Sequence, residues 1–355
     1  MLLHVFAVLV AVSTAVLIFA GGLVTSTGSG LSVPDWPNSY GWFMFAFPIE
    51  NMVGGIFYEH SHRLIASTVG FLILVEATWL WRVEPRRWVR HLGGIALAAV
   101  ITQGVLGGIT VLWYLPDPVS IAHASLAQLV FCLATTIAVV TSPGWARAYR
   151  RLDAPPNAAV LDHPVLDAAV LDDAALNDTV LEDAALEDGV LQTIAKITVA
   201  AIYLQIVIGA TMRHTDAGLA IPDFPWAFGH LVPPHWDAKI AVHFAHRVGA
   251  LCVAALVLAT SGHVCYHHRR RGELVRPSLL LVVLVTTQIT LGALTILSGK
   301  HYIINSAHVV TGGLVLVTTL VLTLRAHRAR FVSLGAGGDV RTPRQRSQAH
   351  AGVGA

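Results

Sequence analysis

Charged residues are scarce in this chain. They make up only 12% of its 355 residues, whereas a soluble domain carries about 25%. Hydrophobic residues reach 55%, and the mean hydropathy is +0.65. This composition argues against an ordinary soluble domain and indicates a protein embedded in a lipid bilayer. The formal net charge of +2 gives no reason to expect a nucleic-acid partner, because the basic residues stand in short clusters between apolar runs.

Cysteine is scarce as well. Cys132, Cys252 and Cys265 match neither a metal-binding nor a disulfide spacing. We therefore expect free thiols buried in apolar segments. A cleavable signal peptide is not expected either. The first apolar run, residues 2–24, is too long for a signal-peptide core and lacks a basic leading region, so it is predicted to be a retained helix.

What the chain has in abundance is long apolar runs. A membrane-spanning helix needs about 20 mostly apolar residues. The segments that meet this requirement are 2–24, 59–81, 92–113, 120–142, 191–212, 240–265, 278–298 and 304–324. The sequence therefore predicts an all-α membrane protein with eight transmembrane helices.

Basic residues predict how these helices are oriented, because cytoplasmic loops carry an excess of Lys and Arg. Clusters beginning at Arg82, Arg147, Arg269 and Arg325 follow the second, fourth, sixth and eighth expected helices. The opposite side carries few basic residues. The chain is therefore expected to cross the inner (cell) membrane several times, with both termini in the cytoplasm. The long loops 25–58 and 213–239 are then expected on the outer side.

The chain also repeats itself. Residues 30–37 (GLSVPDWP) resemble residues 218–225 (GLAIPDFP), and residues 21–25 resemble 208–212. The matched pairs, with their separations, are Asp35 and Asp223 (188), His62 and His246 (184), Gln103 and Gln288 (185), and His123 and His308 (185). Each half holds four helices, so both halves keep the same orientation. The repeat predicts two tandem pseudo-symmetric four-helix bundles, related by an axis along the membrane normal.

A different kind of sequence joins the halves. Residues 158–192 follow an acidic five-residue period with a central Leu. Its seven copies would form fewer than two coils of a solenoid, too few to bury a core. A flexible linker is the favoured interpretation, and a small solenoid or partner-docking piece stays open. The expected domains are an N-terminal bundle (1–146), a cytoplasmic acidic linker (147–190), a C-terminal bundle (191–330) and a disordered cytoplasmic tail (331–355).

Four histidines are the strongest candidates for chemistry. His62 and His123 lie near the outer ends of the second and fourth helices, and His246 and His308 repeat them. Ionisable groups inside a membrane are costly and mark function. Two histidines on facing helices can supply both axial ligands of a haem iron. Hydrogen-bonded interfacial histidines are the simpler interpretation for any one of them, but a repeated pattern of four favours metal ligands.

Glu59 breaks the repeat, because His243 takes its place in the second half. It precedes His62 by three residues, so both are expected on one helical face, where Glu59 could act as an acid, a base or an electrostatic stabiliser. His60 is expected at the interface. Arg63 and Arg247 each follow a ligand candidate and suit a haem propionate or a lipid headgroup.

Further polar residues recur in both halves. Gln103 and Gln288 are expected to pack inside helices or to contact a haem. Asp35 and Asp223 are expected to cap turns rather than to act chemically.

Together these motifs resemble the haem A synthase family over nearly the whole chain, apart from the linker and the tail. The segments that carry the resemblance are 28–37, 59–63, 123–128, 243–247 and 305–308. Several bacterial members of this family carry a cysteine pair in the first outer loop. Ser32 and Ser39 occupy those positions here, so no such disulfide can form.

The resemblance implies an oxidoreductase that converts the C8 methyl group of haem O, through an alcohol, into the formyl group of haem A, with water as the oxygen source. It implies haem b on the iron ligands His246 and His308, substrate haem O on His62 and His123, and a catalytic Glu59. Haem O synthase and the assembly of cytochrome oxidase are the implied partners. A homo-oligomer stays open. The alternatives are a dihaem b-type electron carrier, which would not alter its haems, and a haem transporter or chaperone, which would only pass haem on.

Overall fold

All eight expected helices are present in the computed structural model, which describes residues 1–145, 188–328 and 331. Each is long and apolar enough to cross a membrane. Their bounds are α1 Leu2–Ser26, α2 Gly54–Val83, α3 Arg87–Leu112, α4 Asp117–Val140, α7 Gly189–His214, α8 Ala238–His267, α9 Gly272–Leu297 and α10 Tyr302–Ala326. Short 3-10 turns at Met44–Ala46 and Ile49–Asn51 interrupt the first long loop. The prediction of an all-α membrane fold with eight helices is confirmed.

The helix ends differ from the predicted ones by up to six residues. The largest differences are at α9, which begins at Gly272 rather than 278, and at α2 and α3, which begin at Gly54 rather than 59 and at Arg87 rather than 92. Hydropathy marks the part of a helix that lies in lipid. The backbone hydrogen-bond pattern continues into polar turns beyond it, so every predicted start except that of α1 lies inside the observed helix.

Pro277 explains why the start of α9 was missed, because proline inside a helix removes a backbone donor. The carbonyl of Glu273, which the amide four residues later would normally satisfy, instead accepts a hydrogen bond from Arg325 Nη1 at 2.6 Å. Arg328 Nη1 binds the Glu273 carboxylate at 3.0 Å. Basic side chains at the end of α10 therefore replace the missing bond and fasten α9 to α10.

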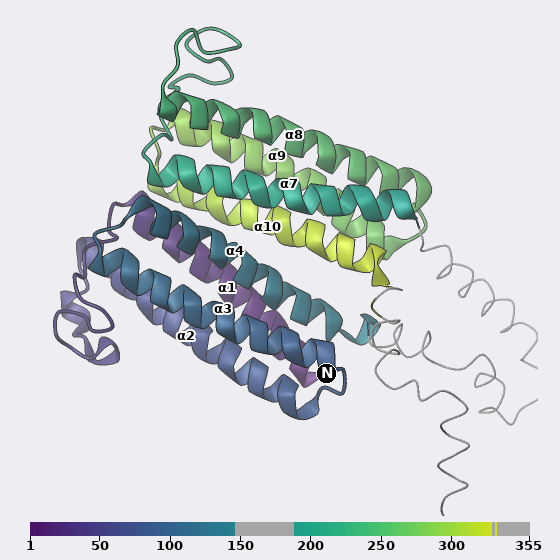
Figure 1. Ribbon diagram of the computed structural model, residues 1–355, viewed down its shortest axis with the longest axis horizontal. Helices are drawn as coiled ribbons and strands as arrows, with labels where there is room; N and C mark the ends of the chain where they lie inside the picture. Colours follow the sequence, from purple (N-terminus) through teal and green to yellow (C-terminus); the bar gives the residue numbers. More distant parts are fainter. Residues whose placement is uncertain (146–187, 329–330, 332–355) are drawn as a thin grey trace, which may run out of the picture.

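The helices contact one another as two groups of four (Figure 1). In the first group α1 contacts α2 and α4, and α3 contacts α2 and α4. In the second group α7 contacts α8 and α10, and α9 contacts α8 and α10. This pattern is compatible with the predicted tandem bundles. The groups meet through α1, α4, α7 and α10, where Ile18, Phe131 and Val317 form a shared apolar cluster.

The long loops lie together at one end of the helices, which we call the loop end (Figure 1). The N-terminus and the short α2–α3 and α8–α9 connections lie at the opposite end, the terminus end. This alternation agrees with the predicted topology, but which end faces the cytoplasm stays a prediction. The acidic linker and the C-terminal tail lie outside the described residues, apart from Asp188–Val190 and Phe331.

Arg325→Met should destabilise the fold, because it leaves the Glu273 carbonyl without a donor. We expect a loss of about 1–3 kcal/mol in the free energy of unfolding, the usual cost of an unsatisfied buried group. Thermal unfolding of the purified protein in detergent measures it. Pro277→Ala restores an amide N–H that can bind this carbonyl, so Arg325→Met should cost less in the Pro277→Ala background. An equal cost in both backgrounds would contradict the assigned role of Arg325.

Candidate functional site

Each of the four candidate histidines packs its ring edge against a glycine of the neighbouring helix. A Cβ built on any of these glycines would approach the ring Cε1 atom to between 2.9 and 3.1 Å. The pairs are Gly21 with His62, Gly107 with His123, Gly209 with His246 and Gly292 with His308. Such contacts are tighter than side chains normally allow, so only glycine lets the rings sit where they do.

The glycines were not predicted as part of the site, although the repeat contained the signal for them. Gly107 and Gly292 are 185 residues apart, the same separation as the histidines they contact. At the first helix of each half, the sequence alignment of residues 21–25 with 208–212 was wrong by one residue. It matched Gly22 with Gly209, whereas the structure gives Gly21 the role of Gly209. Gly22 instead packs against Ser306 of α10.

The histidine pair of the second half is held by hydrogen-bonding groups. The rings of His246 and His308 have centroids 6.4 Å apart and are nearly perpendicular. Nδ1 of His308 lies 3.1 Å from the carbonyl oxygen of Gln288, which can only accept, so Nδ1 carries the proton. Nε2 of His308 then has a lone pair that faces the side-chain amide nitrogen of Gln288 at 3.4 Å. Nδ1 of His246 lies 3.0 Å from the side-chain amide of Gln205.

The pair of the first half is not held in this way. Nδ1 of His62 and Nδ1 of His123 are buried and have no hydrogen-bond partner among the described residues. Leu17 stands 188 residues before Gln205, so the first half lacks the amide that contacts His246. Gln103 donates to the backbone carbonyl of His123 at 2.9 Å rather than to its ring. The two pairs are therefore alike in backbone position but differ in how firmly their rings are oriented.

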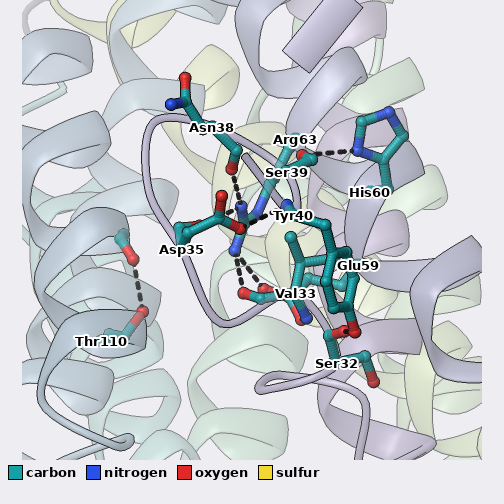
Figure 2. Close-up of polar contacts among 11 residues, drawn as sticks. Ser32, Val33, Asp35, Asn38, Ser39, Tyr40, Glu59, His60, Arg63 and Thr110 are labelled. Carbon is teal, nitrogen blue, oxygen red and sulfur yellow. Dashed lines mark hydrogen bonds and ion pairs between the residues drawn. The ribbon is translucent and has the colours of Figure 1, made fainter. Parts of the chain in front are cut away.

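The two arginines that follow His62 and His246 bind the loops at the loop end. Nη1 and Nη2 of Arg63 donate to the carbonyls of Val33, Asp35 and Asn38 at 2.6–3.0 Å (Figure 2). Arg247 donates to the carbonyls of Ile221, Asp223 and Trp226 at 2.7–3.1 Å. All three carbonyls are matched between the halves at the same separation of 188 residues. Each arginine thus fastens the loop of its own half at the loop end.

Glu59 and His243 play matching parts in these loops. Glu59 is 3% exposed and accepts hydrogen bonds from the Val33 amide at 2.8 Å and from Arg63 Nη2 at 2.6 Å (Figure 2). His243 is 2% exposed, and its Nδ1 lies 3.3 Å from the Ile221 amide and 3.1 Å from the carbonyl of Ala217. The carboxylate thus links α2 to the loop. This linkage was not expected from the sequence, which only placed Glu59 on the face of His62.

The expectation that His60 is interfacial is wrong. Its ring is 1% exposed, contacts Phe47 at a centroid distance of 4.8 Å, and has Nδ1 3.0 Å from Ser39 Oγ (Figure 2). The loop folds back over α2 and covers this ring. Ser39 is therefore part of the packed loop.

The expectation that Asp35 and Asp223 cap turns is confirmed. Asp35 accepts from the amides of Tyr40 and Gly41, and Asp223 accepts from those of Phe228 and Gly229, all at 2.7–2.8 Å. Burial alone would raise the pKa of Asp35, but the hydrogen bonds outweigh it and hold the pKa below its usual value. The amides of Gly229 and Phe228 likewise lower the pKa of Asp223.

Arg213 is a residue whose place was missed, because the sequence marked it only as a loop charge. Its Nη2 donates to the Gly22 carbonyl at 2.7 Å and to Ser26 Oγ at 2.8 Å, which ties α7 of one half to α1 of the other. Nη1 of Arg213 is buried and has no hydrogen-bond partner among the described residues. A buried guanidinium with a free donor is suited to bind a carboxylate.

The free thiols expected from the sequence are present, although only one is shielded. Cys132 is partly buried between the two groups of helices, whereas Cys252 and Cys265 are exposed on the surface of α8. Cysteines on an outward face of a transmembrane helix can contact lipid. The expectation that all three are buried is therefore wrong for Cys252 and Cys265.

These features define a multi-pass membrane protein with an internal repeat and two histidine pairs beneath arginine-held loops. Known proteins agree with this class. The COX15-CtaA family, described as cytochrome oxidase assembly protein, matches residues 44–321. The chain belongs to this family.

Several curated relatives cover most of the chain. The heme A synthase of Geobacillus kaustophilus is 26% identical over 318 residues, 88% of each chain. That of Halalkalibacterium halodurans is 26% identical over 93% of this chain and 99% of its own, and that of Symbiobacterium thermophilum is 28% identical over 79% and 82%.

Arg247→Met should loosen the loop of the second half alone. A hydrogen bond to a charged group contributes about 1.5–3 kcal/mol, so amide exchange at Phe228 and Gly229 should accelerate by at least about tenfold. Hydrogen–deuterium exchange with mass spectrometry measures this change. Tyr40 and Gly41, the matching positions of the first half, serve as the internal control and should keep their protection. Unchanged exchange in residues 221–229 would refute the role given to Arg247.

Proposed function

We propose that this protein is a haem A synthase that oxidises the C8 methyl group of haem O to a formyl group. Two findings support the proposal: the family match with its heme A synthase relatives, and the unequal fixation of two otherwise matching histidine pairs. The second carries most weight, because it gives the halves different tasks. One half keeps a haem, and the other takes one in and releases it changed.

The C-terminal bundle (191–330) is the half we assign to a resident haem b. His246 and His308 would hold the iron of this haem. Metal–imidazole bonds are about 2 Å long and a ring centre lies about 1 Å behind its bonding nitrogen, so two rings that share one metal ion have centres at most about 6 Å apart. The 6.4 Å between His246 and His308 fits this requirement. Donation from Nδ1–H of His308 to the Gln288 carbonyl would orient a metal-bound imidazole and raise its basicity, whereas the Gln205 amide at Nδ1 of His246 would orient that ring only. A bound haem b would supply one-electron redox chemistry.

The N-terminal bundle (1–146) is the half we assign to the substrate. His62 and His123 would hold the iron of haem O. Their Nδ1 atoms lack hydrogen-bond partners among the described residues, so the glycine contacts hold these rings without a hydrogen bond at Nδ1. A site that keeps its haem gains affinity from histidines whose orientation is already fixed, whereas a site that must release its haem does not need that affinity.

The reaction fixes what the residues near the substrate must do. A methyl group and one water molecule become a formyl group, in two stages through an alcohol, with the release of four protons and four electrons. Glu59 is a carboxylate of the first half whose place is taken by His243 in the second. It would accept a proton from water or stabilise positive charge at the oxidised carbon. Its contact with Arg63 Nη2, at 2.6 Å, holds the carboxyl group in place.

The arginines and the partners complete the proposal. Arg247 Nε is buried without a hydrogen-bond partner among the described residues and is available to a haem propionate. Both terminal nitrogens of Arg63 already bind the loop, so a propionate there would have to share these bonds. Haem O synthase would supply the substrate, and an assembling cytochrome oxidase would receive the product. Both termini would face the cytoplasm.

Glu59→Gln should lower conversion of haem O to haem A by about 10²-fold or more, typical for losing a positioned acid or base. Haem b should stay bound. Mass analysis of pigments, extracted after co-expression with a haem O synthase, measures conversion. His243→Gln, the matching change in the second half, should be much milder.

Hydrogen exchange of the first loop shows whether Glu59→Gln acts by disturbing the structure or by removing a chemical group. Glutamine keeps an oxygen that can accept from the Val33 amide, so hydrogen exchange in residues 33–41 should stay protected. Glu59→His, which copies the second half, should keep the loop but also lose conversion. Near-wild-type conversion by Glu59→Gln and Glu59→His would reject the catalytic role, and lost conversion together with an unprotected loop would make that role structural.

His246→Ala and His308→Ala should each remove the low-spin b-type spectrum, because alanine offers no axial ligand. Gly209→Ala should weaken the binding of haem b without abolishing it. Its Cβ would lie 2.9 Å from His246 Cε1 and push the ring aside, so we expect less haem b per polypeptide and a shifted spectrum. Gly262→Ala on α8 is the control, since nothing lies within 4 Å of a Cβ there. Wild-type spectra from both histidine variants would show that the haem b assignment is wrong.

A further inference from the structure

A second cluster of metal-ligating side chains lies at the terminus end of the C-terminal bundle. Asp188, directly before α7, meets His263 and His268 at the end of α8. Asp188 Oδ2 lies 2.6 Å from His263 Nε2 and 3.0 Å from His268 Nε2. One atom from each of the three residues falls within 4.8 Å of the other two. No other such group of three occurs among the described residues.

This cluster is separate from the histidine pairs discussed above. His263 follows His246 by 17 residues on the same helix, which corresponds to about 26 Å along the axis. His246 lies towards the loop end, and His263 lies in the last turns of α8. A ligand bound here would touch neither pair.

The carboxylate is fixed in position by its other oxygen. Asp188 Oδ1 accepts a hydrogen bond from the Leu191 amide at 2.9 Å and caps the start of α7. Oδ2 therefore points towards α8 without any need for reorientation. The three side chains are 20%, 18% and 10% exposed for Asp188, His263 and His268. They are thus shielded from solvent but still accessible to a small ion.

The geometry lies close to that of a metal site. Zinc binds imidazole nitrogen and carboxylate oxygen at about 2.0–2.2 Å, so tetrahedral ligand atoms stand about 3.3 Å apart. The observed contacts of 2.6 and 3.0 Å need to open by less than about 1 Å. Imidazole ligands suit zinc, copper, nickel and iron, whereas calcium and magnesium prefer oxygen alone. Two histidines and one carboxylate leave a fourth position for water.

We propose that Asp188, His263 and His268 form a binding site for a divalent transition-metal ion of the zinc class, which ties the start of α7 to the end of α8. Without metal, the two imidazoles donate to the carboxylate and link the same helix ends. The ion replaces these two N–H hydrogen bonds by three coordinate bonds. The bound ion would also fix the point at which the acidic linker joins the C-terminal bundle, since Asp188 is the last residue of the linker's five-residue repeat before α7.

The test uses the full chain with its haem, purified in detergent, freed of loosely bound metal with a chelator, and titrated with Co²⁺ and with Zn²⁺. Cobalt reports its coordination through its visible absorption, and competition with a coloured chelator gives the zinc affinity. The wild type should bind one more equivalent than His263→Ala or His268→Ala, with at least tenfold weaker binding in each variant. Asp188→Asn keeps a capping oxygen and should also lose the equivalent.

His267→Ala is the matched control. The ring of His267 contacts that of His263 at a centroid distance of 4.5 Å, but it does not belong to the ligand group, so metal binding should be unchanged. Zinc should raise the unfolding temperature of the wild type and of His267→Ala only, because an ion that binds the folded state stabilises it. Equal metal content in wild type and all ligand variants, with no rise in the wild-type unfolding temperature, would overturn the proposal and leave a hydrogen-bonded helix link.

Discussion

Contact between a histidine edge and a glycine on the next helix sets the geometry on which the two sites depend. In all four cases the ring Cε1 atom would lie within 2.9–3.1 Å of a Cβ, if the glycine had one. The backbones can approach only because that atom is missing, and close approach is how helices gain packing energy in lipid. The same contact fixes which edge of each ring faces the neighbouring helix. It therefore joins helix packing to the placement of possible ligand atoms.

Both halves share these histidine–glycine contacts, but they differ at other side chains near the histidines. The loops are held by the same arginine-to-carbonyl bonds in both halves, and the same aspartates cap their turns. Two of the differences are Glu59 against His243 and Leu17 against Gln205. One adds a carboxyl group that binds the first loop, and the other removes an amide from the first histidine pair. Both changes fall in the half that we assign to the substrate, where exchange and proton transfer are needed.

The sequence predicted the helices and the repeat because both depend on pattern. Long apolar runs and near-constant separations survive without knowledge of contacts. It placed His62, His123, His246 and His308 correctly on matching helices, and it predicted the capping aspartates. It could not show that the loop folds back to bury His60, because that burial depends on contacts with Phe47 and Ser39. The arginine-to-carbonyl hydrogen bonds could not be predicted either, because every residue has a backbone carbonyl and the sequence does not mark which ones an arginine contacts.

The division of labour between the halves is the central claim, and haem analysis of paired variants tests it most directly. Haem content and mass would be measured for the purified chain, for His62→Ala with His123→Ala, and for His246→Ala with His308→Ala, each co-expressed with a haem O synthase. The account predicts that the first double variant keeps one equivalent of haem b and makes no formyl haem. The second should lose the haem b. Two identical, unaltered haems in the wild type, each lost with its own histidine pair, would contradict the account and indicate a dihaem electron carrier.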